Sequence, residues 1–492
     1  MNPRLRGDAL LVPVRARGGR AVLPRIDGLS NTLQALLSHL IRRHRPAKVA
    51  GGLEAHLLPI GSGFGWIVLV GLGSDRPVKL IDMLNAGATS MEWCRSHGVK
   101  RAILAAGTLV GAVASDEAAT WVEGAVLGGF RFAVHRTTAL DDKPATSPTL
   151  IVASSGRGDR LLRESIHRAR IAAECANLAR SLGHEPPNVI NPVSLARRAK
   201  QLARRYGLRC RVLDDRQMQT RKMGAILAVG RGSASPPRMI IMEYRPARSR
   251  ARPVVLVGKA VTLDTGGYSI KPSASIAEMK YDKCGGMAVL GALVAASRLK
   301  LGRPVVGVIG AAENMISGDS YRPGDIVRAA SGKTIEVLDT DAEGRLVLAD
   351  CLHYACKTFS PQALIDLATL TGACHVALGD ACAGLFAGDD RLASALIDAG
   401  EKTAERLWRL PLWPVYREQI AGTDADLKNY GGRPAGAVTA AMFLKEFVDD
   451  KVPWAHLDIA GVATTAKALP TCPIGATGFG VRLLIHYLRS RR

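Results

Sequence analysis

The sequence predicts an α/β protein of two domains, a smaller N-terminal α/β domain and a larger C-terminal α/β domain with a mostly parallel central sheet covered by helices. Three observations support this fold class. The chain has 492 residues, more than a single hydrophobic core usually supports. Short apolar strands alternate with helical patterns in both halves, which is typical of parallel sheets. A charged segment with helical spacing and a proline-rich end lies between the two regions, as expected at a domain boundary.

The first part of the chain contains four short apolar runs with two helical patterns among them. Apolar runs bounded by turn residues predict buried strands, and apolar residues at a spacing of three or four predict helices. The strands are expected at 8–14, 66–73, 100–106 and 149–155, and the helices at 79–98 and 118–129. Residues 1–160 are therefore the predicted N-terminal domain.

A long helix is predicted to link the two domains. Residues 160–183 have helical spacing and many charges, and the segment EPPNVINP that follows ends the helix with its prolines. The linking helix and loop are assigned to 161–189, and the second domain to 190–492.

Strands and helices alternate again in the second domain. The strands are expected at 254–258, 305–314, 335–338 and 363–370, and the helices at 285–300 and 346–358. This order predicts a largely parallel sheet covered on both faces. In such sheets ligands bind beyond the carboxyl ends of the strands.

Composition excludes some classes of protein. Hydrophobic residues make up 47% and charged residues 22% of the chain, which is typical of a globular protein. No apolar run reaches the length of about 18 residues that would indicate a membrane span, so no membrane partner is expected. The nine cysteines contain no C-x-x-C pair, and the N-terminal apolar run is broken by Pro13 and is typical of a strand rather than a signal peptide. A cytoplasmic location is predicted.

Two segments concentrate carboxylates after predicted strands. DTDAEGRLVLAD, residues 339–350, places Asp339, Asp341 and Glu343 just before a helix, where like charges repel unless a positive group lies among them. The second segment, residues 255–286, carries Asp264 and Asp282 together with Lys259 and Lys271. Carboxylates from such loops can hold two divalent cations about 3.5–4 Å apart. The absence of histidine favours Mn²⁺ or Mg²⁺ and tolerates Zn²⁺.

These segments resemble the signatures of a known family. VGKAVTLDTGGYSIKP, MKYDKCGG and DTDAEGRLVLAD closely resemble motifs of the leucyl aminopeptidases, the M17 peptidase family, and the similarity covers most of residues 185–492. It implies a catalytic C-terminal domain that releases Leu-type N-terminal amino acids from peptides by a two-metal hydrolysis. The N-terminal third matches only in general pattern and is macro-like by this resemblance.

The resemblance also implies roles for individual residues. The ligands of the tightly held metal would be Lys259, Asp264, Asp282 and Glu343. The ligands of the exchangeable metal would be Asp264, Asp341 and Glu343, and both metal ions would be Mn²⁺ or Zn²⁺. Lys271 would be the electrophile, and Arg345 would hold a bicarbonate ion that acts as the general base. The pocket for the first residue of the substrate would be formed by Met279, Thr369, Leu370, Gly372, Ala460 and Ala463.

Four positions depart from the family pattern. Asp339 stands where Asn is common, Ala260 where Gly is common, Lys283 where Met often follows the metal-binding Asp, and His375 replaces an apolar residue. A charge at Lys283 would weaken metal binding if it pointed inward, and Asp339 would act in the opposite sense. None of the four removes a ligand, so activity is expected.

Two other functions remain open from the sequence. The net charge of +23 favours non-specific binding of DNA or another polyanion, with catalysis secondary, although no aromatic residues interleave with the basic runs. Metal-dependent phosphoester hydrolysis would explain the carboxylates but not the extended similarity. The family resemblance further implies peptide substrates and a homohexamer.

Overall fold

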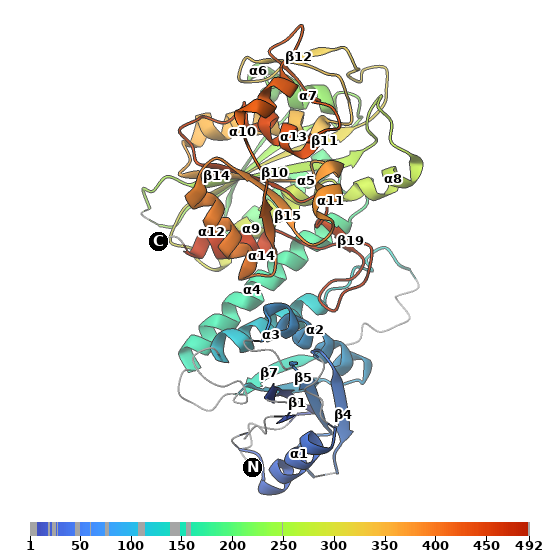
Figure 1. Cartoon of the computed structure of the whole chain (residues 1–492), viewed down its shortest axis with the longest axis vertical. Helices are drawn as coiled ribbons and strands as arrows, with labels where there is room; N and C mark the ends of the chain where they lie inside the picture. The colour runs from blue at the N-terminus through green and yellow to red at the C-terminus, as the bar shows by residue number, and fades with distance from the viewer. Residues whose placement is uncertain are drawn as a thin grey trace. The chain divides into compact units, whose positions relative to one another are not determined.

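The computed structural model describes residues 7–17, 20–21, 26, 28–44, 50–59, 61–73, 78–106, 114–137, 148–153, 159–247 and 249–490. The chain divides into two compact units (Figure 1). Unit 1 is Met1–Glu174 with Lys467–Pro473, and unit 2 is Cys175–Ala466 with Ile474–Arg492. Among the described residues, none of the helices combines the length and apolar character needed to span a bilayer.

Unit 1 is built on a five-stranded sheet of order β4-β5-β1-β6-β7, in which only β4 is antiparallel to its neighbour. The strands are β1 (Ala9–Val14), β4 (Leu53–Leu57), β5 (Trp66–Gly71), β6 (Arg101–Ala105) and β7 (Thr149–Ala153), with a β2 (Ala16–Arg17) and β3 (Arg20–Ala21) pair beside them. Side chains of β1 alternate between two apolar clusters. One cluster includes α1 (Asn31–His44), and the other includes α2 (Leu80–Ser96) and α3 (Ala114–Gly128). The sheet is therefore covered on both faces.

Unit 2 contains an eight-stranded sheet of order β16-β15-β18-β14-β10-β11-β9-β8. The four central strands are parallel, and they are β10 (Val254–Asp264), β11 (Val305–Asn314), β14 (Ala363–Ala368) and β18 (Trp454–Asp458). The outer strands are β8 (Arg209–Leu213), β9 (Arg238–Tyr244), β15 (Ala383–Ala387) and β16 (Leu407–Arg409), and β9 and β15 run antiparallel to their central neighbours. The two units together confirm the predicted α/β fold class.

Helices cover both faces of this sheet. The helix α9 (Cys284–Arg298) packs on β10, β11 and β14, and α10 (Glu343–Phe359) packs on β10 and β11 within the main apolar cluster, which also takes in α7 (Gly224–Gly230) and α13 (Gly436–Lys445). The remaining helices are α4 (Asp159–His184), α5 (Pro192–Arg205), α6 (Asp215–Thr220), α8 (Ser273–Glu278), α11 (Gly372–Leu378), α12 (Asp390–Glu401) and α14 (Val481–Ser490). The described residues also form two short 3₁₀ helices, η4 (Met279–Tyr281) and η5 (Pro414–Ile420).

One predicted strand has a different position. The strand expected at 335–338 is β13 (Thr334–Glu336), which pairs with β12 (Ile326–Arg328) and β17 (Leu427–Lys428) in a separate three-stranded sheet. A further pair is formed by β19 (Thr464–Thr465) and β20 (Gly475–Ala476). The expectation that the acidic segment 339–350 follows a strand of the central sheet is therefore wrong. The acidic segment instead follows β13 of the small three-stranded sheet. The helix α10 begins within this segment and packs on the central sheet.

Candidate metal centre

The strand β10 and the start of α9 bring the first part of the site together. Lys259 lies within β10, Asp264 ends it, and Asp282 lies two residues before the start of α9. The helix approaches the sheet closely because Gly286 lies at the contact, where an added Cβ would be 2.8 Å from the Cβ of Ala260. As a result, Nζ of Lys259 lies 2.7 Å from Oδ1 of Asp282, and both side chains are buried.

The segment before α10 brings the second part. Glu343 is the first residue of α10 and is buried, and Asp341 lies in the preceding turn, partly exposed. Oδ1 of Asp339 accepts a hydrogen bond of 2.8 Å from the backbone N–H of Asp341 and thereby fixes the turn. The hydroxyl of Thr340 donates to the carbonyl of Gly266, 2.6 Å away, which ties the turn to the loop after β10.

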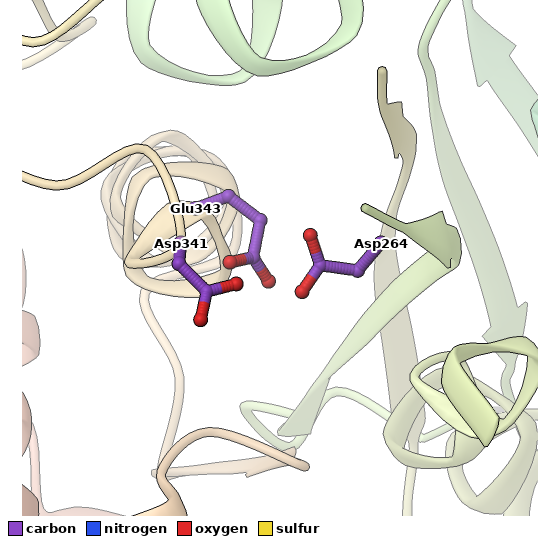
Figure 2. Close-up of side chains that lie close together, drawn as sticks. All are labelled: Asp264, Asp341 and Glu343. Carbon is purple, nitrogen blue, oxygen red and sulfur yellow. The ribbon is translucent and has the colours of Figure 1, made fainter. Parts of the chain in front are cut away.

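The carboxylates of Asp264, Asp341 and Glu343 point toward one another (Figure 2). One ligand atom of each lies within 4.8 Å of those of the other two. Lys259 joins Asp282 to this cluster, because its Nζ is also 2.8 Å from Oε1 of Glu343. Five acidic and basic side chains from three separate segments of the sequence, 259–264, 282 and 341–343, therefore converge.

Lys271 lies on the other side of the cluster. Its Nζ is 3.1 Å from Oδ2 of Asp264 and forms a second ion pair with Asp341. These two carboxylates and the ammonium group line the same cavity of about 450 Å³. All five predicted metal ligands and Lys271 line this cavity.

Crowding and burial disturb the titration of these acids. Burial raises the pKa of Asp282 to about 8, with Lys259 opposing the rise and Glu343 and Asp264 adding to it. Burial raises the pKa of Asp341 to about 7, and Glu343 and Asp264 add to that rise. The four acids therefore repel one another, and the two lysines compensate only part of their charge. A divalent cation would remove the remaining repulsion.

Two buried oxygen atoms that lack a hydrogen-bond donor among the described residues also support a site for divalent cations. Oδ2 of Asp282 and Oδ1 of Asn314 are buried, yet neither accepts a hydrogen bond from any described residue. A buried acceptor without a hydrogen-bond donor destabilises the folded state, so its presence requires an explanation such as a bound ion. An oxygen-rich set of donors suits hard cations such as Mn²⁺ and Mg²⁺.

Lys259 would have to be neutral to act as a ligand. Burial lowers its pKa, but Asp282, Glu343 and Asp264 together raise it, so only a bound cation would favour the neutral amine.

The remaining predicted residues occupy two adjoining cavities. The six predicted pocket residues line the 450 Å³ cavity with the metal cluster, and they are Met279, Thr369, Leu370, Gly372, Ala460 and Ala463. Arg345 does not line it. Arg345 lines a neighbouring cavity of about 670 Å³ that shares Asp341, Leu370 and Gly372 with the first. Its Nη1 donates to the carbonyl of Asn429 at 2.7 Å, while its buried Nε has no partner among the described residues.

The four departures from the family pattern lie in different surroundings. Lys283 is fully buried and points away from the carboxylates, because its ammonium donates to the backbone carbonyls of Gly183 and Glu185, each at 2.9 Å. Its ammonium group forms no ion pair with the four carboxylates of the cluster, but it is close enough to the neighbouring Asp282 to interact with it electrostatically. Ala260 is buried beneath α9. His375 lines the metal cavity, and its Nε2 lies 2.8 Å from Oδ1 of Asp380.

Two asparagines that were not predicted from the sequence fix the loops of the site through hydrogen bonds. Asn314 ends β11 opposite Asp264 and donates from Nδ2 to Oδ1 of Asp264 at 2.8 Å and to the carbonyl of Thr340 at 2.9 Å. Asn429 accepts from the backbone N–H of Leu338 at 2.8 Å and donates to the carbonyl of Asp339 at 2.6 Å. The only sequence signal for Asn314 is its position at the end of a strand adjacent to β10.

Comparisons with known proteins identify the family of this arrangement. The profile of the cytosol aminopeptidase family, catalytic domain, matches residues 177–485, and that of its N-terminal domain matches residues 22–139. A probable cytosol aminopeptidase of Syntrophotalea carbinolica is 43% identical over 99% of this chain and 97% of its own, and one of Aquifex aeolicus is 42% identical over 89% and 88%.

A solved structure agrees with these relatives. The bottromycin maturation enzyme BotP in complex with Mn superposes with a TM-score of 0.86 and 35% identity, covering 98% of this chain and 99% of that one. The family of metal-dependent peptidases matches both parts of the chain, and its catalytic part contains the carboxylate cluster. The chain therefore belongs to the cytosol aminopeptidase (M17) family and is a peptidase.

Proposed function

We propose that this peptidase is a leucyl-type aminopeptidase that removes apolar N-terminal residues by a two-metal hydrolysis. The observation that carries the proposal is the convergence of three carboxylates within 4.8 Å, in a cavity also lined by Asp282, whose buried Oδ2 accepts no hydrogen bond from a described residue. The cations would be Mn²⁺ or Zn²⁺. The proposed ligands are Lys259, Asp264, Asp282, Asp341 and Glu343.

Lys271 and Arg345 would assist the hydrolysis beside the bound cations. When bound, the cations would supply Lewis acidity and lower the pKa of a water molecule. Lys271 would donate a hydrogen bond to the oxyanion that develops at the scissile carbonyl, because its ammonium group faces the carboxylate cluster. Arg345, whose buried Nε has no partner among the described residues, would hold a bicarbonate ion as general base, so that the proton lost by the attacking water can be passed to the leaving amine.

The cavity walls support a preference for Leu or Met as the first residue. Met279, Leu370, Ala460 and Ala463 present apolar atoms to the cavity. A branched or thioether side chain would bury its surface there, which stabilises binding by about 1.5–3 kcal/mol for a fully buried group. The cavity opens beside the metal cluster, so a substrate with a free α-amine would place that amine near the carboxylates.

Hydrolysis of leucine p-nitroanilide by the full chain tests this function. Turnover is expected with added Mn²⁺ and is expected to be lost with a chelator. Asp341→Ala and Lys271→Ala should each reduce kcat by a factor on the order of 10²–10³ or more, while circular dichroism shows that the variants remain folded. A folded wild-type protein without turnover in any divalent metal would contradict the proposal. Bis(p-nitrophenyl) phosphate in the same assay tests the phosphoester alternative.

The family membership also supports an assembly and a location. We propose a homohexamer in the cytoplasm, in keeping with the curated relatives that are described as cytosol aminopeptidases. Light scattering after size-exclusion chromatography tests the assembly. A monomer at micromolar concentration would contradict it.

Binding of polyanions is a second candidate function. Five basic side chains on α5 are exposed and form no ion pair with a described residue, namely Arg197, Arg198, Lys200, Arg204 and Arg205. An unpaired basic face of this kind attracts phosphates without regard to sequence. Fluorescence anisotropy with two unrelated DNA duplexes over a salt series tests it. The double change Arg197→Glu and Arg198→Glu should weaken binding far more than Lys451→Glu, and no binding at low salt would exclude this function.

A further inference from the structure

We propose that the cavity beside Arg345 binds the C-terminal carboxylate of dipeptides and tripeptides, and that Arg433 is the residue that recognises it. This inference rests on the proposed aminopeptidase function and adds a substrate class, short peptides with a free C-terminus. Arg345 and Arg433 line this cavity together.

The two cavities meet at the metal cluster. They share Asp341, Leu370, Thr371 and Gly372. If the first residue of a substrate occupies the cavity with the proposed pocket residues, the scissile bond lies at these shared residues. The second and later residues must then extend into the other cavity. Its volume of about 670 Å³ lies within the range of about 300–1,000 Å³ that is typical of small-molecule sites.

Charge differs between the two cavities. The first is lined by two lysines and five acids, namely Asp264, Glu278, Asp282, Glu343 and the shared Asp341. The second is lined by Arg345 and Arg433, with Asp339 and the shared Asp341 as its acids. A short peptide carries an ammonium group at one end and a carboxylate at the other. Its charges therefore match this arrangement when the amine faces the carboxylate cluster.

Arg433 is available for a ligand, whereas Arg345 is held in place. Arg345 is buried and donates to the carbonyl of Asn429. Arg433 is exposed, and none of the described residues forms a hydrogen bond or an ion pair with its guanidinium. The loop that carries it has a defined shape, because Gly432 and Ala435 on either side have φ values of 90° and 53°. A free guanidinium on such a loop can bind a carboxylate in a bidentate manner.

The rest of the second cavity suits an apolar second residue. Nine of its lining residues are aliphatic, and they include Val376, Ala377, Leu410, Ala437 and Val438. Val376 is 89% exposed, which leaves a large apolar surface at the edge of the site. A substrate side chain placed against it would remove that surface from water. Leucyl-leucine is therefore the probe that fits both cavities.

Kinetics on matched substrates test this site. The KM of the wild type for leucyl-leucine should be roughly tenfold lower than that for leucyl-leucinamide, because a charge-assisted bond to the carboxylate is lost in the amide. Arg433→Gln should remove this difference by raising KM for the free acid alone. Arg433→Lys should keep part of it. Leucine p-nitroanilide, which has no carboxylate, should be hydrolysed equally well by all three proteins.

Two further measurements separate this inference from the proposed function. Arg204→Gln, an exposed arginine on α5 that lines neither cavity, serves as the matched control and should change nothing. Calorimetry with the reduced-bond analogue of leucyl-leucine, as acid and as amide, gives the same comparison without turnover. Equal binding of acid and amide to the wild type, or equal weakening of both by Arg433→Gln, would overturn the carboxylate site. Loss of p-nitroanilide turnover in the wild type would instead contradict the aminopeptidase function.

Discussion

Asp339 shows how one side chain can serve both geometry and charge. Its Oδ1 accepts the backbone N–H of Asp341, and its backbone carbonyl accepts from Asn429. The side-chain bond sets the turn that delivers Asp341 to the cluster. An asparagine, the residue common in the family, could accept the same hydrogen bond through its amide oxygen. What distinguishes Asp339 is its negative charge beside the proposed ligands.

Substitution of Asp339 separates these two contributions. Asp339→Asn keeps the turn and removes the charge, so Mn²⁺ should bind about three- to tenfold more weakly. Asp339→Ala also removes the hydrogen bond to Asp341, and kcat should fall further, by roughly tenfold relative to the Asn variant. Isothermal titration of the metal-free protein with Mn²⁺ and turnover of leucine p-nitroanilide measure the two effects. Identical behaviour of the two variants would show that the hydrogen bond contributes nothing.

At the scale of elements, the contact between α9 and the sheet positions Asp282. Gly286→Ala would place a Cβ 2.8 Å from both the Cβ of Ala260 and the Cγ2 of Ile309, so the helix would have to move outward. The expected cost is about 1–3 kcal/mol in the free energy of unfolding, together with a loss of metal affinity because Asp282 moves with the helix. Urea denaturation and Mn²⁺ titration measure both. Gly302→Ala, with no atom within 4 Å of the added Cβ, is the control.

A second element contact should make stability depend on pH. Asp350 on α10 accepts hydrogen bonds from the backbone N–H groups of Ala225 and Ile226, each at 3.0 Å, and of Ala330 at 2.7 Å. Burial nevertheless raises its pKa to about 7, above the ordinary value of about 4. Between these values the folded state keeps a proton that the unfolded state has released. The contribution of Asp350 to stability should therefore decrease as pH rises from about 4 to about 7.

The matched variant for this prediction is Asp350→Asn, which carries no charge at any pH. Between about pH 4 and about pH 7, the free energy of unfolding of the wild type should fall relative to that of the variant by on the order of a few kcal/mol. Urea denaturation of the metal-free proteins gives this difference. A difference that is constant with pH would show that Asp350 stays ionised throughout.

The sequence predicted elements with strong local patterns and missed those that depend on distant partners. Apolar runs located β1, β11 and β14 closely, and helical spacing located α2 and α9. The strand β18 contains His456 and Asp458, both fully buried. These polar residues interrupt the apolar run by which a buried strand is recognised in a sequence. His456 can be buried because its Nδ1 lies 2.6 Å from Oδ1 of Asp366 in β14. Asn314 and Asn429 likewise acquire their roles only when the fold brings them to Asp264 and Asp339.

At the scale of the whole molecule, all the proposed ligands belong to unit 2, while unit 1 has its own sheet and its own apolar clusters. The sequence placed the ligands in its second domain because their motifs are local. Lys259 contacts both Asp282 and Glu343 only once the sheet is assembled. These contacts could therefore not be predicted from the spacing of the three residues in the sequence. Stability of unit 2 and occupancy of the metal site should therefore be linked.

Addition of metal should stabilise unit 2 selectively. A cation that binds only the folded cluster adds about 1.4 kcal/mol per site to the free energy of unfolding for each tenfold rise in free Mn²⁺ above its Kd. The cation would offset the burial of Asp341 and Asp282 and their repulsion by Glu343 and Asp264, which together raise the pKa of both carboxyl groups. Hydrogen exchange followed by mass spectrometry should show slower exchange in α9 and α10 with Mn²⁺, and unchanged exchange in α2 and α3 of unit 1. Asp341→Ala should reduce the response, and equal protection of both units would contradict a metal site confined to unit 2.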